Sequence, residues 1–212
     1  MILHLIKKDF LLAKRYILII AGIVFAVPLI ITGSSAQLVG ASAFIMTVVY
    51  AEFIFNQQIS MTELRYSGAN ALLCAAPYSR KNIVTAKYIF SLIIFAACCL
   101  VYSSVALIVP QLIDFSLGSV LAALLSVTIL YGIYTPVQFK FGIEKTRFIF
   151  IVFLSGAAAS TQAITQAAAK INLTFLEKVP EAVLALSLLI TSAIIWTVSL
   201  KISIKIFEAK EI

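Results

Sequence analysis

The chain has 212 residues, of which 62% are hydrophobic and 12% are charged, and its formal net charge is +7. A soluble domain is on average about 45–50% apolar and about 25% charged, so this composition excludes a soluble globular domain. The basic excess does not indicate a nucleic-acid partner, because the bases fall in four separate segments at predicted helix ends rather than on one face. We therefore expect an integral membrane protein.

Long stretches without a charged residue divide the chain into predicted spans. Each reaches the roughly 18–20 apolar residues needed to cross a bilayer, and the first, residues 16–51, is long enough for two spans and breaks at the turn residues Thr32-Gly33-Ser34-Ser35. We predict one all-α integral membrane domain covering residues 1–212, with six transmembrane helices at about 16–33, 37–55, 83–109, 118–138, 148–168 and 181–201.

The basic residues predict the orientation of these spans. Of the 16 Lys and Arg residues, all but Lys170 and Lys178 lie on one side of the predicted spans. Because Lys and Arg stay on the cytoplasmic side during membrane insertion, both termini and the tail 202–212 are predicted to be cytoplasmic.

Residues 1–15 are predicted to form an amphipathic helix at the membrane interface. His4, Lys7, Lys8, Lys14 and Arg15 fall within one arc of the helix, and apolar side chains cover most of the rest. Asp9 lies opposite the basic arc, where the sequence offers no role except a contact with another part of the protein. Two interpretations stay open, namely a membrane anchor and a helix that also contacts a cytoplasmic partner.

Residues 56–82 form the longest predicted segment outside the spans. Ser60-Met61-Thr62-Glu63 matches a capping box, in which each side chain bonds the backbone of the other, and Gly68 is a natural helix stop. We expect a short cytoplasmic helix that either receives force from a soluble motor or is incidental. Beyond it, Pro77 ends any preceding turn, Ser79 caps the next span, and Arg80 and Lys81 mark its boundary.

A second cytoplasmic segment, residues 139–147, follows Pro136. It contains Lys140, Lys145 and Arg147, with Gly142 placed for a tight turn and Glu144 placed to pair with Arg147 at i,i+3.

The chemistry predicted within this chain is sparse. No phosphate-binding loop is present, so ATP and Mg²⁺ would have to bind a partner chain, and the single His, His4, lies outside the spans, which argues against a metal or Ser/His site there. Glu52 is a carboxylate inside a long apolar stretch, about one turn from the cytoplasmic end of its span. Such a residue either pairs with a neighbour, for which Lys87, Arg15, Tyr50 and Asn56 are candidates, or handles substrate or protons.

The two cytoplasmic segments resemble those of a known family. The stretch L-L-C-A-A-P-Y-S-R-K-N-I-V-T-A-K-Y at 72–88, followed by F-K-F-G-I-E-K-T-R-F-I at 139–149, resembles small bacterial ABC-2 type permeases. In detail the chain is similar to the branch that includes the permease of the phenol-soluble modulin exporter, which moves amphipathic peptides.

The resemblance implies a fold and a set of partners. It implies a homodimer in a bacterial cell membrane, with two copies of a cytoplasmic P-loop ATPase and a peptide path between the two permease subunits. The ATPase would receive the helix between spans two and three. By position, the coupling role falls on Ser60, Glu63, Leu64, Arg65, Tyr66, Pro77, Ser79, Arg80 and Lys81.

Two other functions stay open from the sequence. One is a proton- or ion-coupled carrier of small solutes that uses Glu52, and the other is a membrane immunity or scaffold protein that transports nothing.

Overall fold

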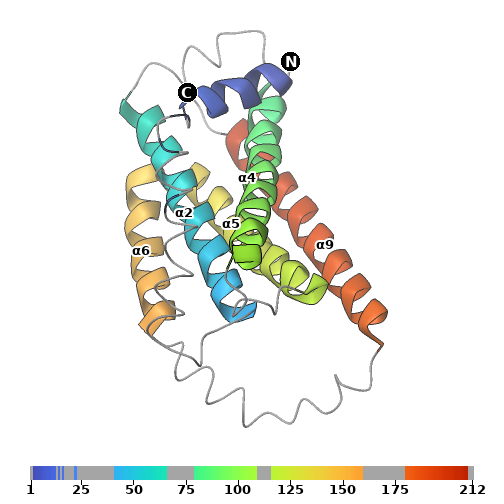
Figure 1. Cartoon of the computed structure of the whole chain (residues 1–212). Coiled ribbons are helices and arrows are strands. Elements are labelled where there is room, and N and C mark those ends of the chain that lie inside the picture. The colour runs from blue at the N-terminus through green and yellow to red at the C-terminus, as the bar shows by residue number, and fades with distance from the viewer. Residues whose placement is uncertain are drawn as a thin grey trace.

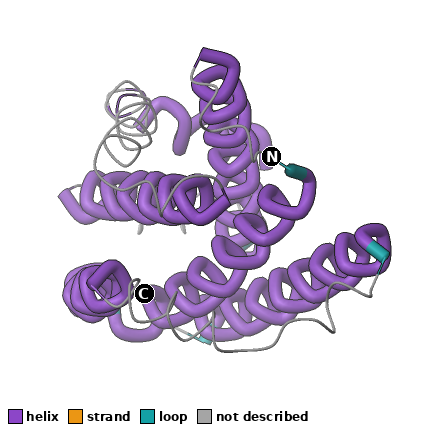
Figure 2. Tube along the Cα trace, turned by 60° about the horizontal axis from the view of Figure 1, so that its bottom comes forward, coloured by secondary structure: helices purple, strands orange, loops and turns teal. Residues whose placement is uncertain are grey.

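A computed structural model of the chain describes residues 2–12, 14, 16, 22, 41–65, 79–108, 116–159 and 180–209. Every regular element among these residues is a helix (Figure 2). Helices α2 (Ala41–Arg65), α4 (Arg80–Ile108), α5 (Leu117–Phe141), α6 (Ile143–Ala159) and α9 (Glu181–Glu208) form the body of the molecule. Within the described ranges, three stretches are long and apolar enough to cross a membrane: Arg80–Val105 of α4, α5 and α9. Nearly all of the first predicted span, 16–33, lies outside the described residues.

The helices alternate in direction, so their charged ends gather at one end of the bundle. Figure 1 shows α2, α5 and α9 running toward that end, with α4 and α6 starting from it. The helix of residues 2–12 crosses the same end, close to where α9 finishes. We call this the basic end, because Arg65, Arg80, Lys140 and Lys205 lie in the terminal turns of helices that meet there.

Helix α5 occupies the middle of the bundle and packs against α2, α6 and α9, while α4 packs against α2 and α9. The main core lies between α2, α4 and α5, where Phe44, Val48, Phe90, Tyr102 and Val127 are buried. Such packing is the default for apolar helices, since each must bury one face against a neighbour. The outward face of α9 keeps large apolar residues such as Leu186 and Ile194 more than half exposed, as a membrane-spanning helix would.

A polar junction joins α4, α5 and α9. Pro136 lies inside α5 and has no N–H to donate to the carbonyl of Gly132 one turn earlier, but Ser199 of α9 donates its hydroxyl to that carbonyl at 2.7 Å. Tyr88 of α4 in turn shares hydrogen bonds of 2.7 and 2.8 Å with Ser199 and Ser203. The junction satisfies the backbone group that the proline leaves free, so α5 continues to Phe141.

The helix of residues 2–12 is held to the basic end by its apolar side. Leu5 is buried against Ile83 and Ala86 of α4, with Phe207 of α9 packed beside them, whereas Leu3 and Leu11 are exposed. His4 and Lys7 are also exposed. This arrangement fits a helix that lies along a surface rather than one that crosses the bundle.

One prediction from local sequence is wrong. Ser60 does not begin a short helix, since α2 runs without a break from Ala41 to Arg65, and the Ser60–Glu63 capping box does not form. A tertiary partner replaces the local bond on which the prediction relied, because Gln138 of α5 donates to Ser60 Oγ. At the end of α5 the helix passes through Pro136 and ends at Phe141, with the predicted turn at Gly142.

Candidate functional site

An ion-paired cluster joins three segments at the basic end. Glu63 lies near the end of α2 and forms two ion pairs. Its Oε1 is 3.0 Å from Lys8 Nζ, and its Oε2 is 2.5 Å from Lys87 Nζ. Lys8 also lies 3.1 Å from Asp9 Oδ1. The side chains of Glu63 and Asp9 are only 5% and 4% exposed. We call Lys8, Asp9, Glu63 and Lys87 the quartet.

The charges of the quartet cancel, with two carboxylates and two ammonium groups. Burial alone would raise the pKa of Glu63, but Lys87 and Lys8 outweigh it and lower that pKa to about 2. For Asp9 burial prevails over Lys87 and Lys8, so its pKa is raised above the ordinary value. Glu63 is therefore held as a carboxylate that ties the N-terminal helix and α4 to the end of α2.

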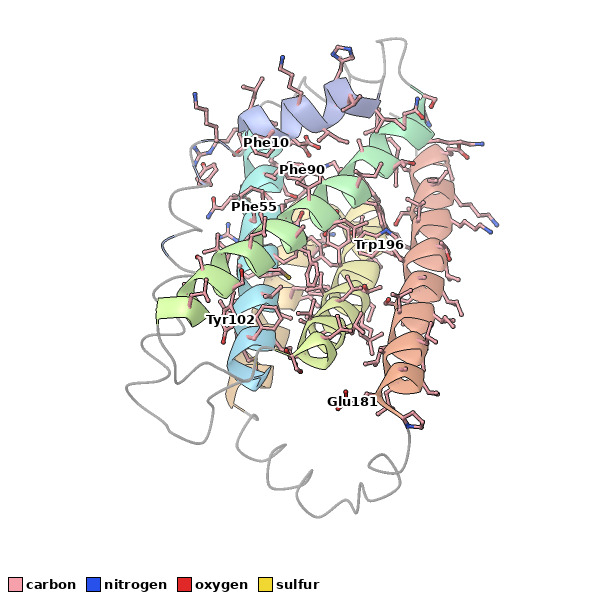
Figure 3. All side chains as sticks on the ribbon, turned by 45° about the vertical axis from the view of Figure 1, so that its right-hand side comes forward. Phe10, Phe55, Phe90, Tyr102, Glu181 and Trp196 are labelled. Atoms are coloured by element: carbon pink, nitrogen blue, oxygen red, sulfur yellow. The ribbon has the colours of Figure 1, made fainter. Side chains whose placement is uncertain are left out.

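Aromatic rings also join the three segments that the quartet links. Phe10 of the N-terminal helix meets the edge of Phe90 on α4 at 6.3 Å between ring centroids, and Phe90 stacks on Phe55 of α2 at 5.8 Å. Figure 3 shows these three rings following one another from the N-terminal helix into the bundle. The same three segments are thus joined twice, by ion pairs and by apolar contact, and are expected to move together.

The structure separates the predicted coupling residues into exposed and internal ones. Leu64, Arg65, Ser79, Lys81, Lys140, Glu144 and Lys145 are exposed at the basic end. Ser60 and Glu63 are buried. Tyr66 and Pro77 lie outside the described residues.

The remaining predicted residues bind other parts of the bundle. Arg80 donates to the carbonyl of Glu208 on α9 at 2.8 Å. Arg147 donates to Met61 Sδ at 3.6 Å, and no ion pair links it to Glu144 among the pairs found in the described ranges. Ser79 caps α4 as predicted, since its hydroxyl accepts the backbone N–H of Asn82 at 3.3 Å.

The sequence did not assign Lys8, Lys87 or Gln138 to this site, since Lys8 was placed only in the basic arc of the N-terminal helix and Lys87 was considered only as a partner of Glu52. Gln138 of α5 donates a hydrogen bond of 2.7 Å to Ser60 Oγ. This bond occupies the hydroxyl oxygen that the capping box would have used as its acceptor. The partners of Glu63 lie 55 and 24 residues away along the chain. One feature of the sequence did point to this site, namely the position of Asp9 on the apolar side of its helix. In the structure Asp9 is buried.

Glu52 lies deeper in the bundle and is 3% exposed. Its Oε1 accepts Asn56 Nδ2 at 3.1 Å and also the hydroxyl of Ser91 on α4. Its Oε2 is buried and has no hydrogen-bond partner among the described residues, and Arg15, another predicted partner, lies outside them. Of the predicted partners, Asn56 is confirmed, whereas Lys87 pairs with Glu63 instead.

Residues 4–208 match the family model described as ABC-2 family transporter protein, so the chain belongs to this family. No curated protein and no solved structure matches the chain. Proteins of this family are permeases, the membrane subunits of ABC transporters, and the family implies an ATPase partner. The protein is thus a multi-pass membrane protein of a transporter.

Proposed function

We propose that this ABC-2 permease exports amphipathic or hydrophobic peptides of the toxin or antimicrobial type. In this proposal the chain forms a homodimer in a bacterial cell membrane with both termini in the cytoplasm, and two copies of a separate ATPase bind and hydrolyse ATP. Family membership supports the transport role. The resemblance of residues 72–88 and 139–149 to peptide-exporting permeases supports the substrate class. The one-sided distribution of Lys and Arg supports the orientation.

One observation carries the proposal furthest: exposed side chains, three of them basic, lie beside Glu63 at the end of α2 and around the turn between α5 and α6, all at the basic end. Leu64 and Arg65 are exposed at the end of α2, one and two residues after the buried Glu63. Lys140 and Lys145 are exposed on either side of the turn at Gly142. We call these four residues the coupling patch. It fits a partner groove with acidic side chains, because complementary charge sets the orientation of docking.

The quartet connects the coupling patch mechanically to the helices inside the bundle. A force on Leu64 and Arg65 acts on the last turn of α2, which is continuous with the residues around Glu52. Through Glu63 the same force reaches Lys87 on α4 and Lys8 on the N-terminal helix. In this role Glu63 is a positioning residue, and the ATPase contact falls to its exposed neighbours.

The test is ATP-driven transport by the permease and its partner ATPase, purified together and placed in lipid vesicles. Arg65→Glu puts a negative charge opposite an acidic groove, and we expect peptide-stimulated ATP hydrolysis to fall by about tenfold or more. Lys201→Glu, an exposed base on α9 outside the coupling patch, is the matched control and should keep the activity. Equal activity of both variants, with both folded, would contradict the assignment of the patch.

A second candidate function has one observation in its favour. The Oε2 atom of Glu52 has no partner in the part of the chain that the structure describes, which suits a carrier that takes up a proton or an ion in the membrane. Such a carrier would transport without ATP along a proton gradient, and Glu52→Gln would abolish that transport while Arg65→Glu left it unchanged. The same vesicles, with a pH gradient and no ATP, decide between the two functions.

A further inference from the structure

One face of the N-terminal helix alternates exposed apolar and exposed basic side chains. Leu3, Lys7 and Phe10 follow one another at intervals of four and three residues, which places them in one row along the helix. Lys14, which is also helical and exposed, continues the row four residues later. Leu3 and Phe10 are 78% and 51% exposed. We call Leu3, Lys7, Phe10 and Lys14 the exposed stripe.

The exposed stripe carries positive charge without a neighbouring carboxylate. Asp9 is the only acidic residue among residues 1–16, and its side chain is buried on the side of the helix away from the stripe. Lys7 and Lys14 take part in none of the ion pairs found in the described ranges. Their ammonium groups are therefore available to an anionic ligand.

The position of the helix along α4 places the stripe at the level of lipid headgroups. Leu5 packs against Ile83 and Ala86, which lie in the first two turns of α4. The stretch Arg80–Val105 that can cross a membrane has 26 residues, or about 39 Å of helix. A bilayer measures about 30 Å across its hydrocarbon core and about 40–45 Å with both headgroup layers. The first turns of α4, and the helix that lies across them in Figure 1, therefore fall in one headgroup layer.

A headgroup layer offers a partner to both kinds of side chain in the stripe. Leu3 and Phe10 are costly to expose to water, but they can enter the boundary between headgroups and acyl chains. Lys7 and Lys14 can extend their ammonium groups to phosphates at the same level. A zwitterionic headgroup balances its phosphate with its own cation, whereas an anionic headgroup leaves that charge for the protein. The charge of the stripe thus complements an anionic lipid surface.

We propose that the exposed stripe binds anionic phospholipid, with acyl chains against its two apolar side chains and headgroup phosphates on its two lysines. This lipid site does not depend on the proposed function. A regulatory role does rest on that function. Because Lys8 follows Lys7 in the chain and pairs with Glu63, lipid that holds the N-terminal helix also holds the end of α2, next to the coupling patch. Anionic lipid then promotes coupling to the ATPase.

The first experiment compares binding of phosphatidylglycerol with binding of phosphatidylcholine of the same acyl chains, by native mass spectrometry of the purified protein. We expect the wild type to prefer phosphatidylglycerol by about tenfold or more, and Lys7→Gln combined with Lys14→Gln to lose most of that preference. Lys140→Gln combined with Lys145→Gln is the matched control. It removes the same charge from the basic end but leaves the stripe intact, so it should keep the preference.

The apolar side chains of the stripe have a separate readout. Leu3→Ser removes an exposed apolar side chain and no charge, so it should weaken binding of both lipids by a similar factor and leave the preference unchanged. Thermal unfolding checks that each variant is folded, which we expect because every substituted side chain is exposed.

Four results would overturn the lipid site. They are equal affinity of the wild type for the two lipids, an unchanged preference in the stripe variant, an equal loss of preference in the control variant, and displacement of phosphatidylglycerol by an equal concentration of glycerol phosphate. The last result would assign the lysines to free phosphate. A stripe variant that keeps the lipid preference but no longer retains the partner ATPase would make the stripe a protein docking surface instead.

The second experiment measures peptide-stimulated ATP hydrolysis by the permease and its partner ATPase in phosphatidylcholine vesicles with and without phosphatidylglycerol. We expect phosphatidylglycerol to raise the rate by about fivefold or more in the wild type, and to have little effect on the stripe variant or on Glu63→Gln, which breaks the link to α2. If the lipid binds as expected but does not change the rate, the regulatory role is wrong. If the lipid binds but no vesicles show ATP-driven transport, the proposed function fails and the lipid site stands.

Discussion

Glu63 is the residue on which the basic end depends, because it is a buried carboxylate with two cationic partners from different segments. Glu63→Gln would leave Lys8 and Lys87 with a neutral partner. Since Lys8 and Lys87 keep 29% and 20% of their side chains exposed, water can solvate part of their charge, and we expect a loss of about 1–3 kcal/mol rather than more. Denaturant unfolding in detergent measures this loss, with the exposed Glu144→Gln as control. Equal stability of the two variants would show that the ion pairs contribute nothing.

The low pKa of Glu63 predicts how stability depends on pH. The pKa of this carboxyl falls from an ordinary value of 4.5 to about 2 in the folded protein. Its stabilising contribution is therefore complete above pH 4.5 and is lost as the pH falls from there through about 2. Asp9 acts in the opposite direction, because its raised pKa favours the protonated form in the fold.

The measurement is unfolding of wild type and Glu63→Gln between pH 6 and pH 2. We expect the stability difference between them to shrink steadily as the pH falls below about 4.5. A difference that stays constant over this range would mean that Glu63 is not held as a carboxylate by Lys8 and Lys87.

Ser199 stabilises the fold by donating a hydrogen bond to the carbonyl of Gly132, which Pro136 leaves without its usual backbone donor. Ser199→Ala removes the 2.7 Å hydrogen bond to the carbonyl of Gly132 and one partner of Tyr88, so we expect a loss of about 1–3 kcal/mol. Ser192 is the matched control, since it is also buried on α9 but, within the described ranges, its hydroxyl donates to the carbonyl of Leu189 on its own helix. Thermal unfolding of both variants in detergent should show Ser199→Ala as clearly less stable, and the reverse order would refute the junction.

At the scale of elements, α2 shows where sequence reasoning succeeded and where it failed. An apolar run predicted a helix from about residue 37, and the structure has one from Ala41. The predicted span ended at about residue 55, and the Ser60 capping pattern predicted a separate short helix after it. The helix continues because Ser60 finds Gln138 and Glu63 finds Lys8 and Lys87, all distant in sequence. Local patterns carry no information about such partners.

The turn between α5 and α6 depends on a single glycine. Gly142 has φ 87° and ψ 167°, a conformation that only glycine adopts readily, and a Cβ there would meet nothing within 4 Å. Gly142→Ala should therefore cost about 1–3 kcal/mol through backbone strain alone. Gly118→Ala, in the first turn of α5, is the control and should be neutral or slightly stabilising. Unfolding measurements that rank the two the other way would contradict this geometry.

At the scale of the whole molecule, composition and charge were enough to predict the membrane class. A chain that crosses lipid must satisfy its backbone internally, so long apolar runs can only be helices, and every described element is helical. The resemblance of two short segments predicted the family that the match over residues 4–208 then showed. The quartet and the polar junction could not be predicted, because each joins helices whose packing the sequence does not reveal.

The central claim is that an ATPase acts on the exposed end of α2. The most direct test is purification of the tagged permease from its native membranes in mild detergent, with identification of the chains that come with it and an ATPase assay. We predict a stoichiometric P-loop ATPase that is retained by Lys201→Glu and lost or uncoupled by Arg65→Glu. A folded permease that carries no ATPase would contradict the account.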